Sequence, residues 1–149
     1  MTGKQTILLV EDEARDVELT RRAFRRHGLE GRLVVATDGQ QALEHLSGEE
    51  RTPDLVLLDL KLPGLDGHEV LRRIRADPRT RLVPVVVLTS SDEERDRLRC
   101  YETGANSYIR KPVDYTRFTE VVRQLGHYWL VLNEPPPLRR DPETTATAG

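Results

Sequence analysis

Short apolar runs alternate with longer charged stretches along the chain. The first and last charged stretches repeat their apolar residues every three or four positions, which is typical of an amphipathic helix. The apolar runs are too short to show that period and consist mainly of leucine and valine, which is typical of strands buried on both faces. The pattern predicts strands within residues 6–10, 32–37, 54–59, 83–90 and 105–112.

The charged stretches have recognisable ends. Gly28 and Gly48 stand where helix C-termini are expected, and Pro78 cannot continue a helix. Five strands that alternate with five helices imply right-handed crossovers and a parallel sheet covered on both faces. The predicted fold class is therefore α/β, a doubly wound five-stranded parallel sheet. The predicted helices are residues 11–28, 40–48, 67–77, 92–104 and 114–132.

Composition narrows the classes of function. The formal net charge of −2, from 23 basic and 25 acidic residues, argues against general binding to nucleic acid or to a membrane surface. No apolar run approaches the ~18–20 residues that a membrane-spanning helix needs. The single cysteine, Cys100, cannot form an internal disulfide, which favours a reducing compartment. We expect a cytoplasmic protein with neither nucleic acid nor membrane as a partner.

Charged and hydroxyl side chains stand where the predicted strands end. In open α/β sheets the ligand site lies outside the carboxyl ends of the strands. If the first and third strands are neighbours, three carboxylates converge on one pocket. The residues at the strand ends are Glu11, Asp12, Asp59, Thr89 and Lys111.

This set of side chains has a chemical interpretation. Carboxylates at close range cannot all stay ionised unless a cation offsets them. Mg²⁺ suits such a site, because it takes one or two carboxylates, water and a phosphate oxygen as ligands. Lys111 adds a positive charge and Thr89 a hydroxyl, and together they fit the oxygens of a phosphoryl group.

Each of these residues also has a structural interpretation when it is taken alone. An aspartate at a strand end is often a helix N-cap, and Glu11-Asp12 could simply begin a helix, where negative charge is favourable. A lone threonine at a strand end is usually structural, and a lone lysine is usually a solvated charge. Four strand ends that carry matching chemistry within one α/β order favour a shared site over these separate explanations.

The strand-end residues lie in four motifs, "LLVEDE", "DLVLLDLKLPGLDG", "VVVLTSS" and "SYIRKPVD". With these motifs, residues 5–126 resemble the receiver domain of two-component response regulators. The resemblance implies a flavodoxin-like receiver fold with strand order 2-1-3-4-5. It further implies a signalling protein that accepts a phosphoryl group from a phosphohistidine of a sensor histidine kinase. Enzymatic activity would be limited to self-phosphotransfer and autodephosphorylation, both dependent on Mg²⁺.

The resemblance also assigns roles to single residues. Asp59 would be the phosphoacceptor and Lys111 the amine that pairs with the phosphate. Thr89 and Tyr108 would form the conformational switch, and Lys111–Pro112 would be a cis peptide bond. The Mg²⁺ ligands would be Asp12, which binds directly, Asp59, the backbone carbonyl of Lys61 and, through water, Glu11.

The end of the chain carries a second, separate signal. The predicted helix 114–132 becomes apolar nearly all round in its last turns, and such a helix requires burial. We expect a symmetric homodimer, although the tail could instead fold back over the helix. The receiver domain with its helical extension is expected over residues 1–133, and residues 134–149, rich in Pro and Thr, are expected to be disordered. The predicted dimer contacts are Tyr128, Trp129, Leu130 and Val131.

Two segments, one of them at the end of the chain, narrow the resemblance to one branch of the family. "YWLVLNEPPP" and "DPRTRLVPVVVLTSS" resemble the single-domain response regulators that partner phytochrome-type histidine kinases. Output is then expected to run through protein contacts that depend on phosphorylation. The implied partner is a sensor histidine kinase, with a bacteriophytochrome as the specific expectation.

Three alternative functions fit the sequence less well. A phosphatase of the haloacid dehalogenase type would need an Asp-x-Asp-x-Thr signature, which neither "EDEAR" nor "DLKLP" supplies. A receiver fold kept only as a binding module would not need the whole set of strand-end residues. A nucleotide-binding flavodoxin-like or Rossmann protein would be expected to carry a G-x-G-x-x-G motif or a P-loop, and the chain contains neither.

Overall fold

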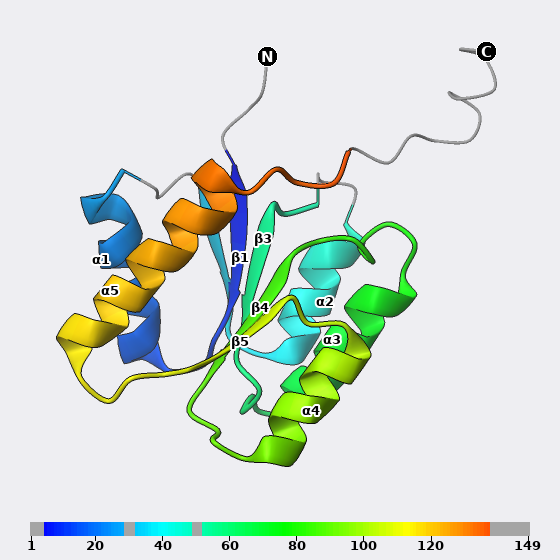
Figure 1. The fold of residues 1–149 in the computed structure, drawn as a ribbon. Helices are drawn as coiled ribbons and strands as arrows, with labels where there is room; N and C mark the ends of the chain where they lie inside the picture. The colour runs from blue at the N-terminus through cyan, green and yellow to red at the C-terminus, as the bar shows by residue number, and fades with distance from the viewer. Residues whose placement is uncertain (1–4, 29–31, 49–51, 138–149) are drawn as a thin grey trace, which may run out of the picture.

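The computed structural model describes residues 5–28, 32–48 and 52–137. These residues form a central sheet and the helices that cover it (Figure 1). In chain order the elements are β1 (Thr6–Val10), α1 (Ala14–Arg26), β2 (Arg32–Ala36), α2 (Gly39–Ser47), β3 (Leu55–Leu58), α3 (Gly67–Ala76), β4 (Val85–Thr89), α4 (Glu94–Thr103), β5 (Ser107–Arg110), α5 (Tyr115–Gly126) and η1 (His127–Leu132).

The sheet has five parallel strands in the order β2-β1-β3-β4-β5. The helices α1 and α5 cover one face, and α2, α3 and α4 cover the other (Figure 1). This arrangement confirms the predicted fold class and strand order. It also makes β1 and β3 neighbours, with Val10 paired to Leu58, which was the condition for convergence of the acidic residues.

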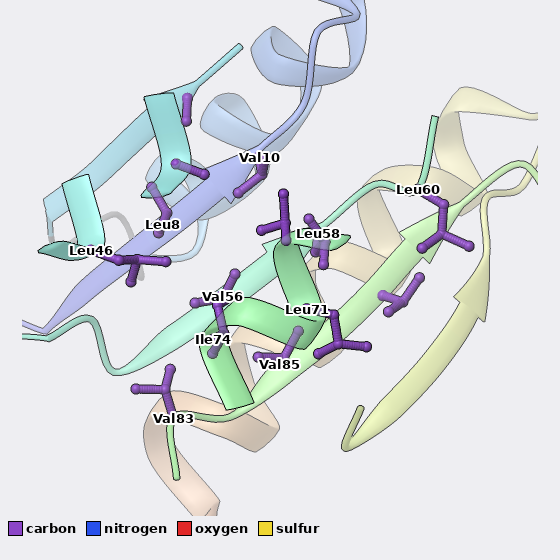
Figure 2. Close-up of a cluster of buried hydrophobic side chains, with 14 of the residues drawn as sticks. Leu8, Val10, Leu46, Val56, Leu58, Leu60, Leu71, Ile74, Val83 and Val85 are labelled. Carbon is purple, nitrogen blue, oxygen red and sulfur yellow. The ribbon is translucent and has the colours of Figure 1, made fainter. Parts of the chain in front are cut away.

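Alternation along the strands divides the interior into two hydrophobic clusters. In β1, Leu8 and Val10 join the cluster beneath α2 and α3, whereas Ile7 and Leu9 join the cluster beneath α1 and α5. Figure 2 shows the first cluster, where residues such as Leu71 of α3 lie over the sheet. Each buried side chain of this size contributes about 1.5–3 kcal/mol relative to full exposure. Burial on both faces explains why the strands read as unbroken apolar runs.

Aspartates begin three of the helices. Asp38, Asp66 and Asp114 each accept a hydrogen bond from a backbone N–H three residues later, at 2.8, 2.9 and 3.1 Å. Such an N-cap stabilises a helix by roughly 1 kcal/mol, because it satisfies a donor that has no partner within the helix. Asp66 thereby fixes the start of α3 close to the end of β3.

The last predicted helix differs from the observed one. The α-helix ends at Gly126, and residues 127–132 form a π-helix in which Asn133 N–H donates to the carbonyl of Tyr128, 2.7 Å away. In the sequence, Leu132 stands at helical spacing from Phe118 and Leu125, which predicts that it faces the sheet, but its side chain is 61% exposed. The wider π turn breaks the 3.6-residue period on which that expectation rested. Trp129 still packs against the cluster beneath α1 and α5.

Two further predictions concern the Lys111–Pro112 peptide bond and the C-terminal tail. Every peptide bond among the described residues is trans, so the predicted cis bond at Lys111–Pro112 is wrong. The intrinsic preference of such a bond is for trans, by about 0.5–1 kcal/mol. Residues 134–137 are exposed and form no regular structure, while the remainder of the predicted tail, 138–149, lies outside the described residues. Within the part of the chain that the structure describes, none of the helices has the length and apolar character needed to cross a bilayer.

Arg75 links two connections at the end of the sheet opposite the strand C-termini. Its guanidinium donates to the carbonyls of Gly104 (2.8 Å), Arg81 (2.9 Å) and Val83 (2.7 Å), and to Oδ1 of Asn106 (2.8 Å). Burial lowers the pKa of this guanidinium, although an arginine stays charged at neutral pH. One side chain therefore satisfies acceptors from the α3–β4 and α4–β5 connections.

We expect Arg75→Ala to lower the free energy of unfolding by about 2–3 kcal/mol, because several partly buried acceptors lose their donor. Urea denaturation followed by circular dichroism measures this loss. The matched control is Arg72→Ala on the same helix, whose guanidinium is exposed and pairs with Glu69. The control should unfold close to the wild-type midpoint, and an equal loss in both variants would contradict the assigned role.

Candidate functional site

The strand C-termini bring the predicted site residues to one edge of the sheet. Glu11 follows β1 and Asp59 follows β3, so the pairing of these two strands sets the carboxylates side by side. Their backbones are anchored: Glu11 N–H donates to Ala36 O (2.9 Å), and Asp59 N–H donates to Val10 O (3.1 Å). Both carboxylates are almost fully buried.

Lys111 supplies the positive charge at this edge. Its amine donates to Glu11 Oε1 at 2.5 Å, to Asp16 Oδ2 at 2.9 Å and to Asp59 Oδ2 at 3.0 Å. An ammonium group has three N–H donors, and each of them meets a carboxylate here. Its backbone N–H donates to Thr89 O at 2.7 Å, which fixes the amine-bearing residue to the end of β4. The side chain is only 9% exposed, so these ion pairs are shielded from water.

The pKa values reflect this crowding of charge. Burial, reinforced by the neighbouring charge of Asp59, raises the pKa of the Glu11 carboxyl to about 7 despite its hydrogen bond to Lys111. Burial would lower the pKa of Lys111, but the carboxylates of Glu11, Asp59 and Asp16 outweigh it and hold that pKa above its ordinary value. The amine thus stays charged at neutral pH and offsets only part of the negative charge around it.

The remaining negative charge fits a divalent cation. Glu11, Asp12 and Asp59 each offer a carboxylate oxygen, and these oxygens lie within 4.8 Å of one another. Asp12 is exposed while the other two are buried, so the cluster opens to solvent on one side. Hard oxygen donors with access to water are the environment that Mg²⁺ and Mn²⁺ prefer. The predicted convergence of three carboxylates is therefore present.

The backbone around Asp59 requires glycine close by. A Cβ at Gly67 would lie 2.4 Å from the Asp59 carbonyl oxygen and 2.6 Å from Leu60 Cα. Such contacts are far inside van der Waals distance, so a larger residue would displace the strand end or the start of α3. Lys61, the predicted carbonyl ligand, is exposed and donates its own N–H to Asp59 Oδ1 at 3.2 Å.

The two predicted switch residues meet at Ser91. Thr89 is fully buried, and its hydroxyl oxygen accepts the N–H of Ser91 at 3.4 Å. The hydroxyl of half-buried Tyr108 donates to the carbonyl of the same serine at 3.0 Å. One residue, Ser91, therefore contacts the side chains of both predicted switch residues.

Two features of the site escaped the sequence analysis. Asp16, in the first turn of α1, reaches the Lys111 amine; the only signal in the sequence is an acid one helical turn after Asp12. His68 at the start of α3 lies 3.0 Å from Asp96 Oδ1, and Asp96 Oδ2 accepts the Ser91 hydroxyl at 2.7 Å. These hydrogen bonds from Ser91 and His68 lower the pKa of Asp96. No sequence spacing links residues so far apart in the chain.

Comparison with known proteins places this arrangement in a family. Residues 7–123 match the response regulator receiver domain. The chain belongs to the response regulator receiver family. Receivers accept a phosphoryl group from a histidine kinase, so the predicted role as a two-component signalling protein and the predicted class of partner are confirmed.

Two curated relatives align over most of their length. The protein named "Probable methanogenesis regulatory protein FilR2", from Methanothrix harundinacea, is 43% identical over 134 residues, which is 87% of this chain and 86% of that protein. Response regulator Rcp1 from Synechocystis is 36% identical over 131 residues, covering 85% and 89% of the two chains.

The solved structures most like this receiver include phytochrome response regulators. The phosphorylated cyanobacterial phytochrome response regulator RcpA has a TM-score of 0.84 at 35% identity, covering 91% of this chain and 99% of that one. The Mn²⁺-bound form of Rcp1 has a TM-score of 0.82 at 34% identity, covering 89% and 99%. The bacteriophytochrome response regulator RtBRR is 47% identical with a TM-score of 0.69, covering 91% and 86%. The predicted resemblance to phytochrome-associated regulators is confirmed.

Proposed function

We propose that Asp59 is the residue of this receiver that carries the phosphoryl group. The supporting observation is the ion pair of its Oδ2 with the buried Lys111 amine, at the edge of the sheet where Glu11 and Asp12 also lie. Oδ1 is held by the Lys61 N–H, and the Asp59 backbone is held by β1. The carboxylate is thus fixed in position before a phosphate donor arrives, which is the main requirement of phosphoryl transfer.

In the proposed transfer, a carboxylate oxygen of Asp59 forms a bond to the phosphorus of a phosphohistidine. The P–N bond of the donor breaks, and the imidazole nitrogen keeps the electron pair. The Lys111 amine, already 3.0 Å from Asp59 Oδ2, offsets the negative charge on the phosphoryl oxygens. In the separate step of hydrolysis, water attacks the phosphorus, the P–O bond to Asp59 breaks with its electron pair left on the carboxylate, and inorganic phosphate leaves while the proton of the water passes to solvent. Enzymatic activity is limited to these reactions on the chain's own residue.

The cation of this site is proposed to be Mg²⁺. Glu11, Asp12 and Asp59 would hold it through their carboxylates, with the backbone carbonyl of Lys61 as a further ligand; the donor set and the Mn²⁺-bound relative support this. When bound, Mg²⁺ supplies charge neutralisation to the phosphoryl oxygens. Glu11 and Asp12 follow β1 and Asp59 follows β3, so the ends of these two strands bring the carboxylates together.

We expect Asp12→Ala to weaken Mg²⁺ binding at least about tenfold, because the site loses its one exposed carboxylate ligand. Isothermal titration calorimetry measures the affinity. Glu13→Ala is the matched control, since Glu13 is the neighbouring exposed acid and is not part of the carboxylate cluster. Equal affinity of Asp12→Ala and wild type would remove Asp12 from the metal site.

The proposed output is a change of surface around β4, α4 and β5. The acyl phosphate adds about one negative charge and new acceptor oxygens. The Thr89 hydroxyl can turn to donate to one of these oxygens, and Ser91 then transmits the shift to Tyr108. To change the populated state, the phosphoryl group must bind the active form better by a few kcal/mol. Partner proteins read this surface.

The proposed kinase is of the phytochrome type, and the proposed compartment is the cytoplasm. The likeness to RcpA and RtBRR supports the first proposal. The free, buried thiol of Cys100 and the net charge of −2 support a reducing compartment and a protein partner, with neither nucleic acid nor membrane as the target.

Replacement of the acceptor tests the central proposal. We expect Asp59→Asn to abolish incorporation of ³²P from a phosphorylated histidine kinase, because the amide cannot form the acyl phosphate, while the circular dichroism spectrum stays unchanged. Asp92→Asn, at an exposed residue after β4, is the matched control and should be labelled like wild type. Undiminished labelling of Asp59→Asn would refute the assignment.

We further propose that residues 1–133 form the receiver with a helical extension through which it dimerises, ahead of a disordered tail at 134–149. Within η1, Trp129 and Leu130 are half-buried, whereas Tyr128 and Val131 are 49% and 55% exposed. The Tyr128 and Trp129 rings pack edge to face, with centroids 5.0 Å apart. An apolar surface of this kind suits the self-complementary contact of a two-fold dimer.

We expect wild type to be dimeric at micromolar concentration. The double variant Tyr128→Ser/Val131→Ser should raise the dissociation constant of the dimer at least about tenfold, because it removes exposed apolar area and leaves the hydrophobic core unchanged. Multi-angle light scattering over a dilution series gives the mass. Leu98→Ser/Val113→Ser, at exposed apolar residues elsewhere, is the control and should match wild type. A monomeric wild type at every concentration would overturn the dimer.

A further inference from the structure

Asp16 is the one carboxylate on Lys111 that stands outside the candidate metal cluster. Its Oδ2 accepts from the amine at 2.9 Å, and its side chain is 14% exposed. The other two partners, Glu11 and Asp59, belong to the group whose oxygens converge on a cation position. The amine is therefore shared between two potential metal ligands and one residue of α1.

The backbone of Asp16 is held within α1. It lies in the first turn of α1, and its carbonyl oxygen accepts the hydroxyl of Thr20, which is buried, at 2.7 Å. Lysine has a long side chain with several rotatable bonds, whose freedom is costly to restrict. A carboxylate on a packed helix restricts that freedom without occupying a position that the metal or the phosphoryl group needs.

We propose that Asp16 is a positioning residue that holds the Lys111 amine beside the acceptor oxygen of Asp59. The proposal rests on the proposed function of Asp59. When Glu11 and Asp59 turn their oxygens toward a cation, Asp16 remains the partner that keeps the amine in place. The amine then meets the incoming phosphoryl oxygens already oriented, so that part of the ordering cost is met before transfer.

A purely structural role predicts different behaviour. An acid in the first turn of a helix stabilises it through the helix dipole, whether or not a lysine is present. In that case a change at Asp16 would affect unfolding, and its effect on phosphorylation would be independent of Lys111. Acting through Lys111, Asp16 would lose its influence on the rate once the amine is gone, which a double-mutant cycle detects.

The experiment measures phosphorylation by acetyl phosphate at saturating Mg²⁺, by intact-protein mass spectrometry, in the full chain. We expect Asp16→Ala to lower the maximal rate about tenfold, the size expected for loss of a charge-assisted hydrogen bond. The half-saturating acetyl phosphate concentration should change less than twofold. Asp16→Asn should lose less, because its amide oxygen still accepts one N–H. In a Lys111→Met background, neither substitution at Asp16 should change the residual rate.

Controls make each outcome decisive. Glu18→Ala, an exposed acid on the same helix, should react at the wild-type rate, and titration calorimetry should show Mg²⁺ affinity of the Asp16 variants within threefold of wild type. An unchanged rate in Asp16→Ala, or the same fractional loss with and without Lys111, overturns the inference while Asp59 labelling stands. If Asp16→Ala does not fold, the nearly isosteric Asp16→Asn completes the cycle. Absence of any labelling in wild type overturns the proposed function itself.

Discussion

The ion pairs of the Lys111 amine are the interaction on which the site depends. Glu11 and Asp59 are almost fully buried, and two carboxylates at that depth would be strongly destabilising without a cation beside them. The amine offsets part of this charge, yet burial, reinforced by the charge of Asp59, still raises the pKa of Glu11. The same imbalance that makes the cluster costly to bury makes it suited to a divalent ion and to a phosphoryl group. The buried carboxylates of Glu11 and Asp59 therefore affect both the stability of the fold and the chemistry of the site.

The sheet explains how this charge is tolerated. Two hydrophobic clusters, one on each face, hold β1 and β3 in register, and the strand ends then deliver the carboxylates to a fixed edge. Around that edge, polar contacts continue outward. Ser91 contacts Thr89, Tyr108 and Asp96, and Asp96 in turn reaches His68 at the start of α3. A rigid interior thus borders a hydrogen-bonded rim that connects β4, α3 and α4.

Much of this architecture could be predicted from the sequence, for physical reasons. Parallel strands end at a common edge, so the positions of Glu11, Asp59 and Lys111 in their strands were enough to predict that their side chains would meet. Contacts that depend on the rotation of a helix, such as that of Asp16, could not be predicted in the same way. The exposure of Leu132 was mispredicted because the π turn changes the residue period, and the trans bond at Lys111–Pro112 departs from the family expectation.

The Lys111 contacts also constrain how the molecule is made. The amine is separated by 100 residues from Glu11 and by 95 from Asp16, and it arrives only with β5. A nascent chain that has left the ribosome as far as α4 already contains all the acids of the cluster but lacks their counter-ion. Lys111 can therefore pair with these acids only late in synthesis. Until then the carboxylates are more stable in water than buried.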